Sequence, residues 1–259
     1  MIFSLPFFVG AALVSSNRTS NVKFTAKQWV NIAIIGCLGY YISSLLDFIG
    51  LQYVSAGIER LILFIFPTLV LLMSSVFFKE RIKPFQWVAL AVTYVGLAIA
   101  YFGEINYRPQ QKQDFLFGSL MIFICAITYA VYIVGSGRLI PTIGATKFNS
   151  YAMSFASVAV LVHFFSGNGS LLGLTTQVYV YGFLMAIFST VIPSYLVTAA
   201  INRIGSDNSA IVSSAGPVST MVLAYIFLSE DITTWQVSGT VFILVGVWII
   251  GKQKSNANK

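Results

Sequence analysis

The stretch SAGIERLILFIFPTLVLLMSSVFFKERIK, from Ser55 to Lys83, decides the fold that this chain adopts. From Leu61 to Phe78 it contains no charged residue, and this length and composition predict a helix that crosses about 30 Å of hydrocarbon. Glu59 and Arg60 precede the apolar run, and Pro67 lies near its middle. Three basic residues follow it, namely Lys79, Arg81 and Lys83. The stretch therefore predicts a membrane-spanning helix with a bend at the proline.

The same design returns 150 residues later without a gap. Gly205 to Thr233 reads GSDNSAIVSSAGPVSTMVLAYIFLSEDIT, so Pro217 falls on Pro67 and Glu230 falls on Glu80. The register continues into the next apolar segment, where four pairs are identical: Gln86 and Gln236, Val95 and Val245, Gly96 and Gly246, and Ile99 and Ile249. A proline within a membrane segment, followed at a fixed distance by a glutamate, is a specific signal. The chain is predicted to be a duplicated membrane unit.

Composition excludes an ordinary soluble domain. The chain is 57% hydrophobic and 9% charged, and its mean hydropathy is +0.84. Continuous apolar runs of this length need every backbone group bonded internally, which favours an all-α polytopic membrane protein whose environment is the lipid bilayer. The net charge of +7 does not indicate a nucleic-acid partner, because the basic residues lie in short loops between apolar runs.

Nine apolar segments are predicted as spans: Met1–Ser15, Trp29–Gly50, Val54–Phe78, Phe85–Gly103, Phe115–Gly135, Lys147–Ser166, Val178–Ala200, Asn208–Leu228 and Trp235–Gly251. We assign residues 1–103 to a first repeat, 115–252 to a second repeat, and 253–259 to a polar cytoplasmic tail. The offset leaves the opening segment of the second repeat without a counterpart. We therefore expect a truncated or mis-started chain whose first repeat lacks its first helix; the alternative is a cleaved signal peptide.

Lysine and arginine predict the topology. One set of alternate connections contains twelve basic residues: Arg18, Lys23, Lys27, Lys79, Arg81, Lys83, Arg138, Lys147, Arg203, Lys252, Lys254 and Lys259. The other set contains three, Arg60, Arg108 and Lys112. This asymmetry predicts a multi-pass membrane protein with a cytoplasmic C-terminus. Five helices per unit is an odd number, so the two repeats would insert in opposite orientations, an inverted-topology architecture typical of secondary transporters.

These motifs resemble the EamA family of the drug/metabolite transporter superfamily. The resemblance lies in a proline-interrupted fourth helix that ends in a glutamate, as in FFKE (Phe77–Glu80) and FLSE (Phe227–Glu230). It also lies in a fifth helix that opens with glutamine and carries a glycine, namely Gln86 with Gly96, and Gln236 with Gly246. The resemblance implies a ten-helix inner-membrane carrier with cytoplasmic termini, often an exporter of amino acids or related metabolites.

Glu59 and Arg60 are the clearest candidates for a substrate or proton site. A charge near the centre of a bilayer costs about 2.5–3.5 kcal/mol, so such residues should face a cavity or a partner. Side chains of consecutive helical residues point about 100° apart, so we do not expect these two to pair with each other. Asp47 is the expected partner of Arg60. The alternative is an interfacial acid beside an arginine that reaches for the lipid headgroups.

Prolines and buried tyrosines complete the candidate cavity. Pro67 and Pro217 each remove an intrahelical hydrogen bond, and Pro217 follows the hydroxyls of Ser213 and Ser214. Pro193 is a weaker candidate because the first repeat has no matching proline; packing kinks are the alternative for all three. Five tyrosines lie within apolar segments rather than at loop borders and would need polar partners there: Tyr40, Tyr41, Tyr129, Tyr132 and Tyr195.

Catalytic chemistry is not expected. His163 is the only histidine, and the sequence contains neither a metal-ligand cluster nor a Gly-rich phosphate loop. We therefore predict no enzyme activity, no metal and no cofactor. The preferred interpretation is a secondary transporter, expected to be an exporter, which moves small metabolites by alternating access, with Glu59 or Asp47 as a proton carrier. The alternative is an inactive truncated or scaffold membrane protein that needs a partner helix.

Overall fold

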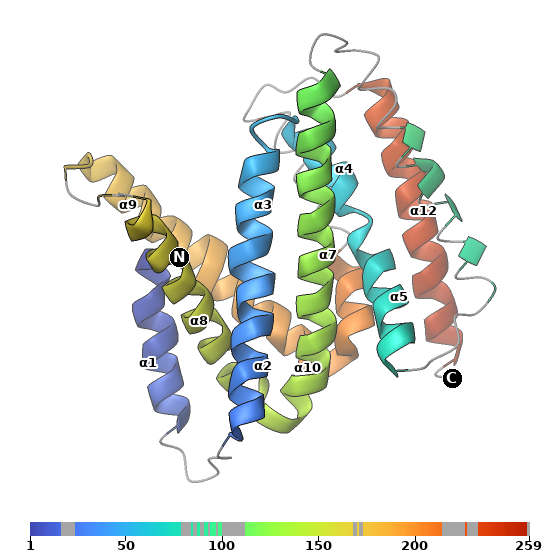
Figure 1. Cartoon of the computed structure of the whole chain (residues 1–259). Helices are drawn as coiled ribbons and strands as arrows, with labels where there is room; N and C mark the ends of the chain where they lie inside the picture. Colours follow the sequence, from blue (N-terminus) through green and yellow to red (C-terminus); the bar gives the residue numbers. More distant parts are fainter. Residues whose placement is uncertain are drawn as a thin grey trace. The chain divides into compact units, whose positions relative to one another are not determined.

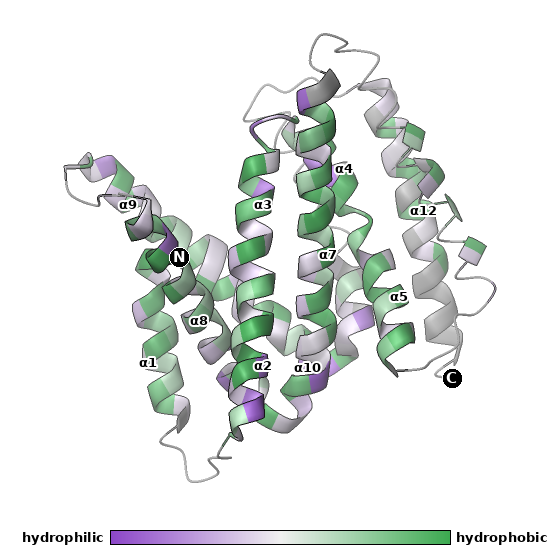
Figure 2. Cartoon of the chain, in the orientation of Figure 1, coloured by the Kyte–Doolittle hydropathy of each residue, from purple (hydrophilic) through white to green (hydrophobic). Residues whose placement is uncertain are grey.

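The computed structural model describes residues 1–16, 24–78, 112–167, 173–213 and 233–257, together with single residues or short pieces between 84 and 99 and at 170 and 226. Regular structure in these residues is entirely helical. Within these described residues, four helical runs are long and apolar enough to cross a membrane: Ala26–Gly50, Asp114–Ile143, Ala145–Ser166 and Thr176–Asp207. The all-α polytopic membrane fold is confirmed, and Figure 2 shows how apolar residues dominate the helices.

The elements in chain order are as follows. The first half contains η1 (Ile2–Ser4), α1 (Leu5–Ser16), α2 (Ala26–Gly36), η2 (Cys37–Ile42), α3 (Ser43–Gly50), α4 (Ala56–Leu63) and α5 (Phe66–Phe78). The second half contains α7 (Lys112–Ile143), α8 (Ala145–Ser166), α9 (Thr176–Met185), η4 (Ala186–Val191), α10 (Ile192–Ser213) and α12 (Thr234–Ala257). Figure 1 shows α2, η2 and α3 as one continuous helical run and α7 as another.

Four predicted boundaries differ clearly from the structure. The segment Val178–Ala200 continues in α10 to Ser213, with a non-helical backbone only at Gly205. The segment Val54–Phe78 is two helices, α4 and α5, because Pro67 cannot donate a backbone hydrogen bond and occupies the first turn of α5 instead. The segment Phe115–Gly135 continues to Ile143, since the residues after Gly135 remain helical and Pro141 lies inside the last turn of α7. The predicted polar tail is helical to Ala257, as good helix formers such as Lys and Gln follow Gly251.

Two π-helices occupy equivalent places in the predicted duplication. Adding 150 to the bounds of η2, Cys37–Ile42, gives 187–192, within one residue of η4, Ala186–Val191. The Ile192 N–H donates to the Ile187 carbonyl, the i→i−5 bond that defines the wider turn. Such turns often mark functional positions in helices. The two π-helices thus share the 150-residue offset of the repeated sequence, and this agreement is independent support for the duplication.

The chain divides into two compact units. Unit 1 comprises Met1–Ile42 and Val131–Ser206, and unit 2 comprises Ser43–Ala130 and Asp207–Lys259. Each unit therefore combines segments from both predicted repeats. The assignment of residues 1–103 and 115–252 to two repeats stays a prediction from the sequence, since the compact units of the structure do not follow these boundaries.

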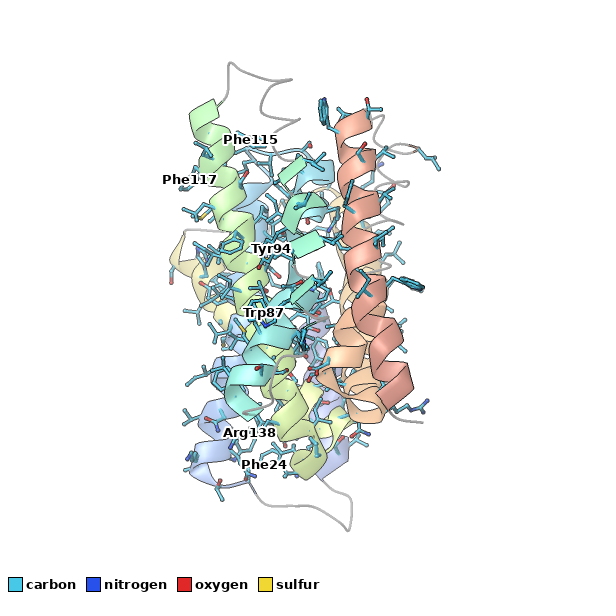
Figure 3. All side chains as sticks on the ribbon, turned by 90° about the vertical axis from the view of Figure 1, so that its right-hand side faces the viewer. Phe24, Trp87, Tyr94, Phe115, Phe117 and Arg138 are labelled. Carbon is cyan, nitrogen blue, oxygen red and sulfur yellow. The ribbon has the colours of Figure 1, made fainter. Side chains whose placement is uncertain are left out.

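Unit 1 is organised around α8, which contacts α1, α2 and η2. α2 approaches α8 closely at Gly36, where an added Cβ would lie 2.8 Å from the Ala152 Cα and 2.9 Å from its carbonyl carbon. At one end of the unit, the ammonium of Lys147 lies 4.2 Å from the centre of the Phe24 ring. Arg138 lies at the same end as Phe24 (Figure 3). Lys147 and Arg138 thus lie at the end of unit 1 where Phe24 precedes α2.

Unit 2 brings α3 close to the first half of α7. A Cβ on Gly50 would lie 2.9 Å from the Gly118 carbonyl oxygen, and a Cβ on Gly118 would lie 2.9 Å from the Gly50 oxygen. Phe117, near the N-terminal end of α7 (Figure 3), meets Tyr53 edge-on with ring centres 5.3 Å apart. α12 contacts α4. This packing fixes the C-terminal turn of α3, which carries Asp47, beside α4.

We predict that Gly36→Ala destabilises the protein by about 1–3 kcal/mol, because the added methyl overlaps backbone atoms that cannot move aside like a flexible side chain. Gly10→Ala in α1 is the matched control, since nothing lies within 4 Å of its added Cβ. The control should be neutral or gain up to about 1 kcal/mol from helix propensity. Thermal melting of the purified variants in detergent measures both, and equal melting temperatures would contradict the packing described here.

Candidate functional site

The candidate site in unit 2 is built on an ion pair at the start of α4. Glu59 is fully buried, and its Oε1 lies 2.8 Å from Arg60 Nη1. The Arg60 side chain is 34% exposed. The expectation that these neighbours do not pair is wrong, because the arginine side chain is long enough to bridge the angular separation of the two Cβ atoms. Glu59 is thus a buried charge with its counter-ion on the next residue.

Local sequence explains why an acid is tolerated at this position. Ser55 precedes α4, and its Oγ accepts the backbone N–H of Ile58 at 3.3 Å, which caps the helix. Glu59 therefore lies in the first turn, where the positive end of the helix dipole favours a carboxylate. The Ser55 cap and the acidic Glu59 both mark this turn as the start of a helix, and both signals can be recognised in the sequence alone.

Asp47 joins the ion pair from the last turn of α3. It lies close enough to interact electrostatically with Arg60 and to hydrogen-bond with Glu59. Asp47 Oδ1 is buried and has no hydrogen-bond partner among the described residues. The thiol of Cys125, on α7, also lies within electrostatic range of both acids. The cluster therefore sets two carboxyl groups against one guanidinium, and one further positive charge or proton makes it neutral.

The break between α4 and α5 lies one turn beyond this cluster. Phe64 donates to the Arg60 carbonyl at 3.1 Å, and Ile65 donates to Ile62 at 3.1 Å, which tightens the chain before α5 begins. Pro67 is buried in the first turn of α5. Thr68 is fully buried, and its Oγ1 has no hydrogen-bond partner within the part of the chain that the structure describes. Polar groups thus continue from the cluster into the break.

The other predicted site residues do not all join this cluster. In unit 2, the Tyr129 ring lies 5.2 Å from Phe66 at the start of α5, and Ser213 Oγ donates to the Ser209 carbonyl of its own helix. In unit 1, Tyr40 meets Tyr132 edge-on with ring centres 5.0 Å apart. Ser214 and Pro217 lie outside the described residues. The remaining two predicted residues are in α10 of unit 1: Pro193 and Tyr195.

Sequence reasoning missed two polar contacts. In unit 2, Ser74 Oγ donates to Asp207 Oδ1 at 2.8 Å, which ties α5 to the helix that follows Gly205. The sequence offered a signal for Asp207, because this acid stands at the start of the segment that repeats α4. In unit 1, Asn149 and Ser150 of α8 bond to Ser194 and Tyr195 of α10. No signal for that contact exists in the sequence, since it depends on the packing of distant helices.

Metal binding is not supported by the described part of the chain. Among those residues, no group of three or more His, Cys, Asp or Glu side chains is placed to hold an ion. The arrangement can instead bind a proton or a small polar solute. Arg60 has five N–H donors, of which Glu59 uses at least one, and Asp47 offers an acceptor.

Comparison with known proteins gives one family. The model of the EamA-like transporter family matches residues 1–102 and 116–252. The chain is similar to "Uncharacterized transporter YcbK" of Bacillus subtilis (strain 168), with 31% identity over 222 residues that cover 82% of this chain and 70% of that protein. It is similar to an "Uncharacterized transporter" of Archaeoglobus fulgidus, with 21% identity over 98% of this chain and 88% of that protein.

A solved structure supports the fold. It is described as "Crystal structure of protein" and matches the whole chain and 88% of its own, with a TM-score of 0.68 and 17% sequence identity. At that identity the likeness concerns the fold alone.

We predict that Arg60→Met destabilises the protein by up to about 3 kcal/mol, because it leaves the buried Glu59 carboxylate without its bonded cation. Glu59→Gln combined with Arg60→Met should recover much of this loss, since neither charge then remains. A double-mutant cycle of thermal melts in detergent measures the coupling. Strictly additive effects would show that the two side chains do not interact in solution.

Proposed function

Because the chain belongs to the EamA-like transporter family, we propose that it is a secondary transporter that exports a small polar metabolite, an amino acid or a related compound, by alternating access. The observation that carries this proposal is the buried Glu59, paired with Arg60 and approached by Asp47. Ionisable groups within membrane segments are costly and usually belong to a transport pathway. The relatives named transporters agree with this class of function.

The chemistry of the cluster favours a zwitterionic solute. The guanidinium of Arg60 is a third exposed and has donors to spare for a carboxylate. Asp47 Oδ1 is an acceptor without a partner among the described residues, and it suits an ammonium group. A solute that carries both groups would satisfy both ends. This complementarity supports the amino-acid class within the range of metabolites that carriers move.

We further propose that Glu59 or Asp47 carries a coupling proton. Two carboxyl groups beside one guanidinium leave one negative charge uncompensated, which a proton or the solute ammonium can neutralise. Binding of either would exclude the other at the same carboxylate. Competition of this kind links solute release to proton uptake, so an inward proton gradient would drive export.

The first test compares metabolites inside and outside cells that express the protein. We expect one or more amino acids or related compounds to accumulate in the medium. Glu59→Gln should reduce this flux at least about tenfold, because it removes a charged group that takes part in the transport cycle. Asp114→Asn is the matched control, since Asp114 is an exposed acid in the first turn of α7. A protonophore should abolish export at unchanged protein levels.

Two outcomes would overturn the proposal. Flux equal to that of the wild type in both Glu59→Gln and Asp47→Asn would remove the cluster from the mechanism. If no compound moves in either direction, the alternative of an inactive or scaffold membrane protein gains instead. Uptake from the medium would leave a transporter but reverse the proposed direction.

We propose that the end of unit 1 that carries Lys147 and Arg138 faces the cytoplasm, together with the C-terminus. Basic residues near the ends of spans are retained on that side. A reporter that is active only in the cytoplasm, fused after Lys259, should be active, and one that requires export should not. The opposite pattern would invert the proposed orientation in the inner membrane.

A further inference from the structure

Unit 1 contains a polar contact between α8 and α10 that is separate from the charged cluster. Asn149 Nδ2 donates to Ser194 Oγ at 3.0 Å, and the hydroxyls of Ser150 and Tyr195 lie 2.7 Å apart. Two consecutive residues of one helix thus meet two consecutive residues of the other. This contact begins directly after Pro193, where η4 gives way to α10.

The orientation of the Asn149 amide follows from the chemistry of Ser194. The Ser194 hydroxyl donates its single proton to the Val191 carbonyl oxygen, 2.9 Å away. Towards Asn149 the same oxygen is therefore an acceptor, so the amide atom that faces it must be the donor, Nδ2. The other amide atom, Oδ1, points elsewhere as an acceptor.

The second pair behaves in the same way. Ser150 Oγ donates to the Thr146 carbonyl oxygen at 2.8 Å, which uses its only proton. The phenol of Tyr195 is then the donor in the bond to Ser150. With these protons committed, the free positions at this contact are lone pairs on Asn149 Oδ1 and on the phenol oxygen. The contact offers acceptors and suits a ligand group that donates.

Burial makes the free acceptor on Asn149 costly. Asn149 is fully buried, and Oδ1 has no hydrogen-bond partner among the residues that the structure describes. An acceptor without a partner loses its hydration and gains nothing in exchange, and within a bilayer no bulk water compensates it. A donor from outside this part of the chain would remove that cost.

Charge decides what kind of donor fits. All eight acidic residues of the chain lie in unit 2, and residues 1–42 and 131–206 contain neither Asp nor Glu. An ammonium ligand would therefore find no carboxylate in unit 1. A neutral hydroxyl or amide N–H needs no such counter-ion.

We propose that Asn149 Oδ1 and the phenol oxygen of Tyr195 form a second binding site, in unit 1, for an uncharged solute that carries hydroxyl or amide N–H donors. The buried ring of Phe8, whose centre lies 5.9 Å from that of Tyr195, gives the site an apolar side. The proposal is independent of transport through the charged cluster, because Asp47, Glu59 and Arg60 belong to unit 2. Absence of binding at this site would therefore leave the proposed transport function intact. Loss of the transport function would likewise leave the proposed binding site intact.

The test uses the purified full chain in lipid nanodiscs, labelled with ¹⁵N-asparagine. Asn149→Leu, a change of similar size, identifies the side-chain NH₂ signal of Asn149 by its absence. The sample is titrated with glycerol and acetamide as neutral donors, with ethylammonium chloride as a cationic donor, and with sodium acetate as an acceptor. Asn202→Leu is the matched control, since Asn202 is an exposed asparagine of α10 in the same unit.

We expect saturable shifts of the Asn149 signal with glycerol and acetamide in the wild type and in Asn202→Leu, and none with acetate. Ser194→Ala removes the acceptor that orients the amide and should weaken binding about 3- to 10-fold, as expected for loss of one hydrogen bond. No saturable shift with any probe would overturn the proposal and leave an acceptor satisfied by water. A shift with ethylammonium alone would overturn the neutral class of ligand.

Discussion

The ion pair of Glu59 and Arg60 is the constraint on which the candidate site depends. A fully buried carboxylate is stable only when a counter-ion or a proton compensates it, because burial removes its hydration. This requirement fixes the start of α4, keeps the last turn of α3 beside it through Asp47, and leaves Arg60 partly exposed. Burial of the Glu59 carboxylate has a high electrostatic free energy. For the same reason, an added proton or charge changes the free energy of the pair strongly.

The helix breaks distribute polar groups along the spans. In unit 2, Pro67 separates α4 from α5 next to the charged cluster, and Thr68 contributes a buried hydroxyl. In unit 1, the π-turn of η4 and Pro193 precede the contact between Asn149 and Ser194. Irregular backbone is tolerated at membrane depth where protein or a wet cavity satisfies it. The two units thus use one device, an interrupted helix, with charged chemistry in unit 2 and neutral chemistry in unit 1.

The amino-acid sequence predicts the all-helical membrane fold well, because long apolar runs leave a strong one-dimensional signal. It also identifies Glu59 and Arg60 as unusual, since charges stand out in apolar sequence. It does not predict that they pair, because that depends on the rotamer of a flexible arginine. The π-turns of η2 and η4 are likewise missed, as i→i−5 bonding has no residue code. Asn149 and Asp207 are missed because their partners, Ser194 and Ser74, are brought close only by tertiary packing.

The most direct test of the central claim measures net flux and exchange of the exported solute in vesicles that contain the purified protein. In the proposed mechanism Glu59 or Asp47 must lose a proton in each net cycle, whereas exchange of solute for solute needs no proton release. Glu59→Gln resembles a carboxyl that stays protonated, so if Glu59 is the proton carrier this variant should lose net flux driven by a pH gradient and keep exchange, while Asp114→Asn keeps both. Gradient-driven net flux that survives Glu59→Gln and Asp47→Asn alike would contradict the account.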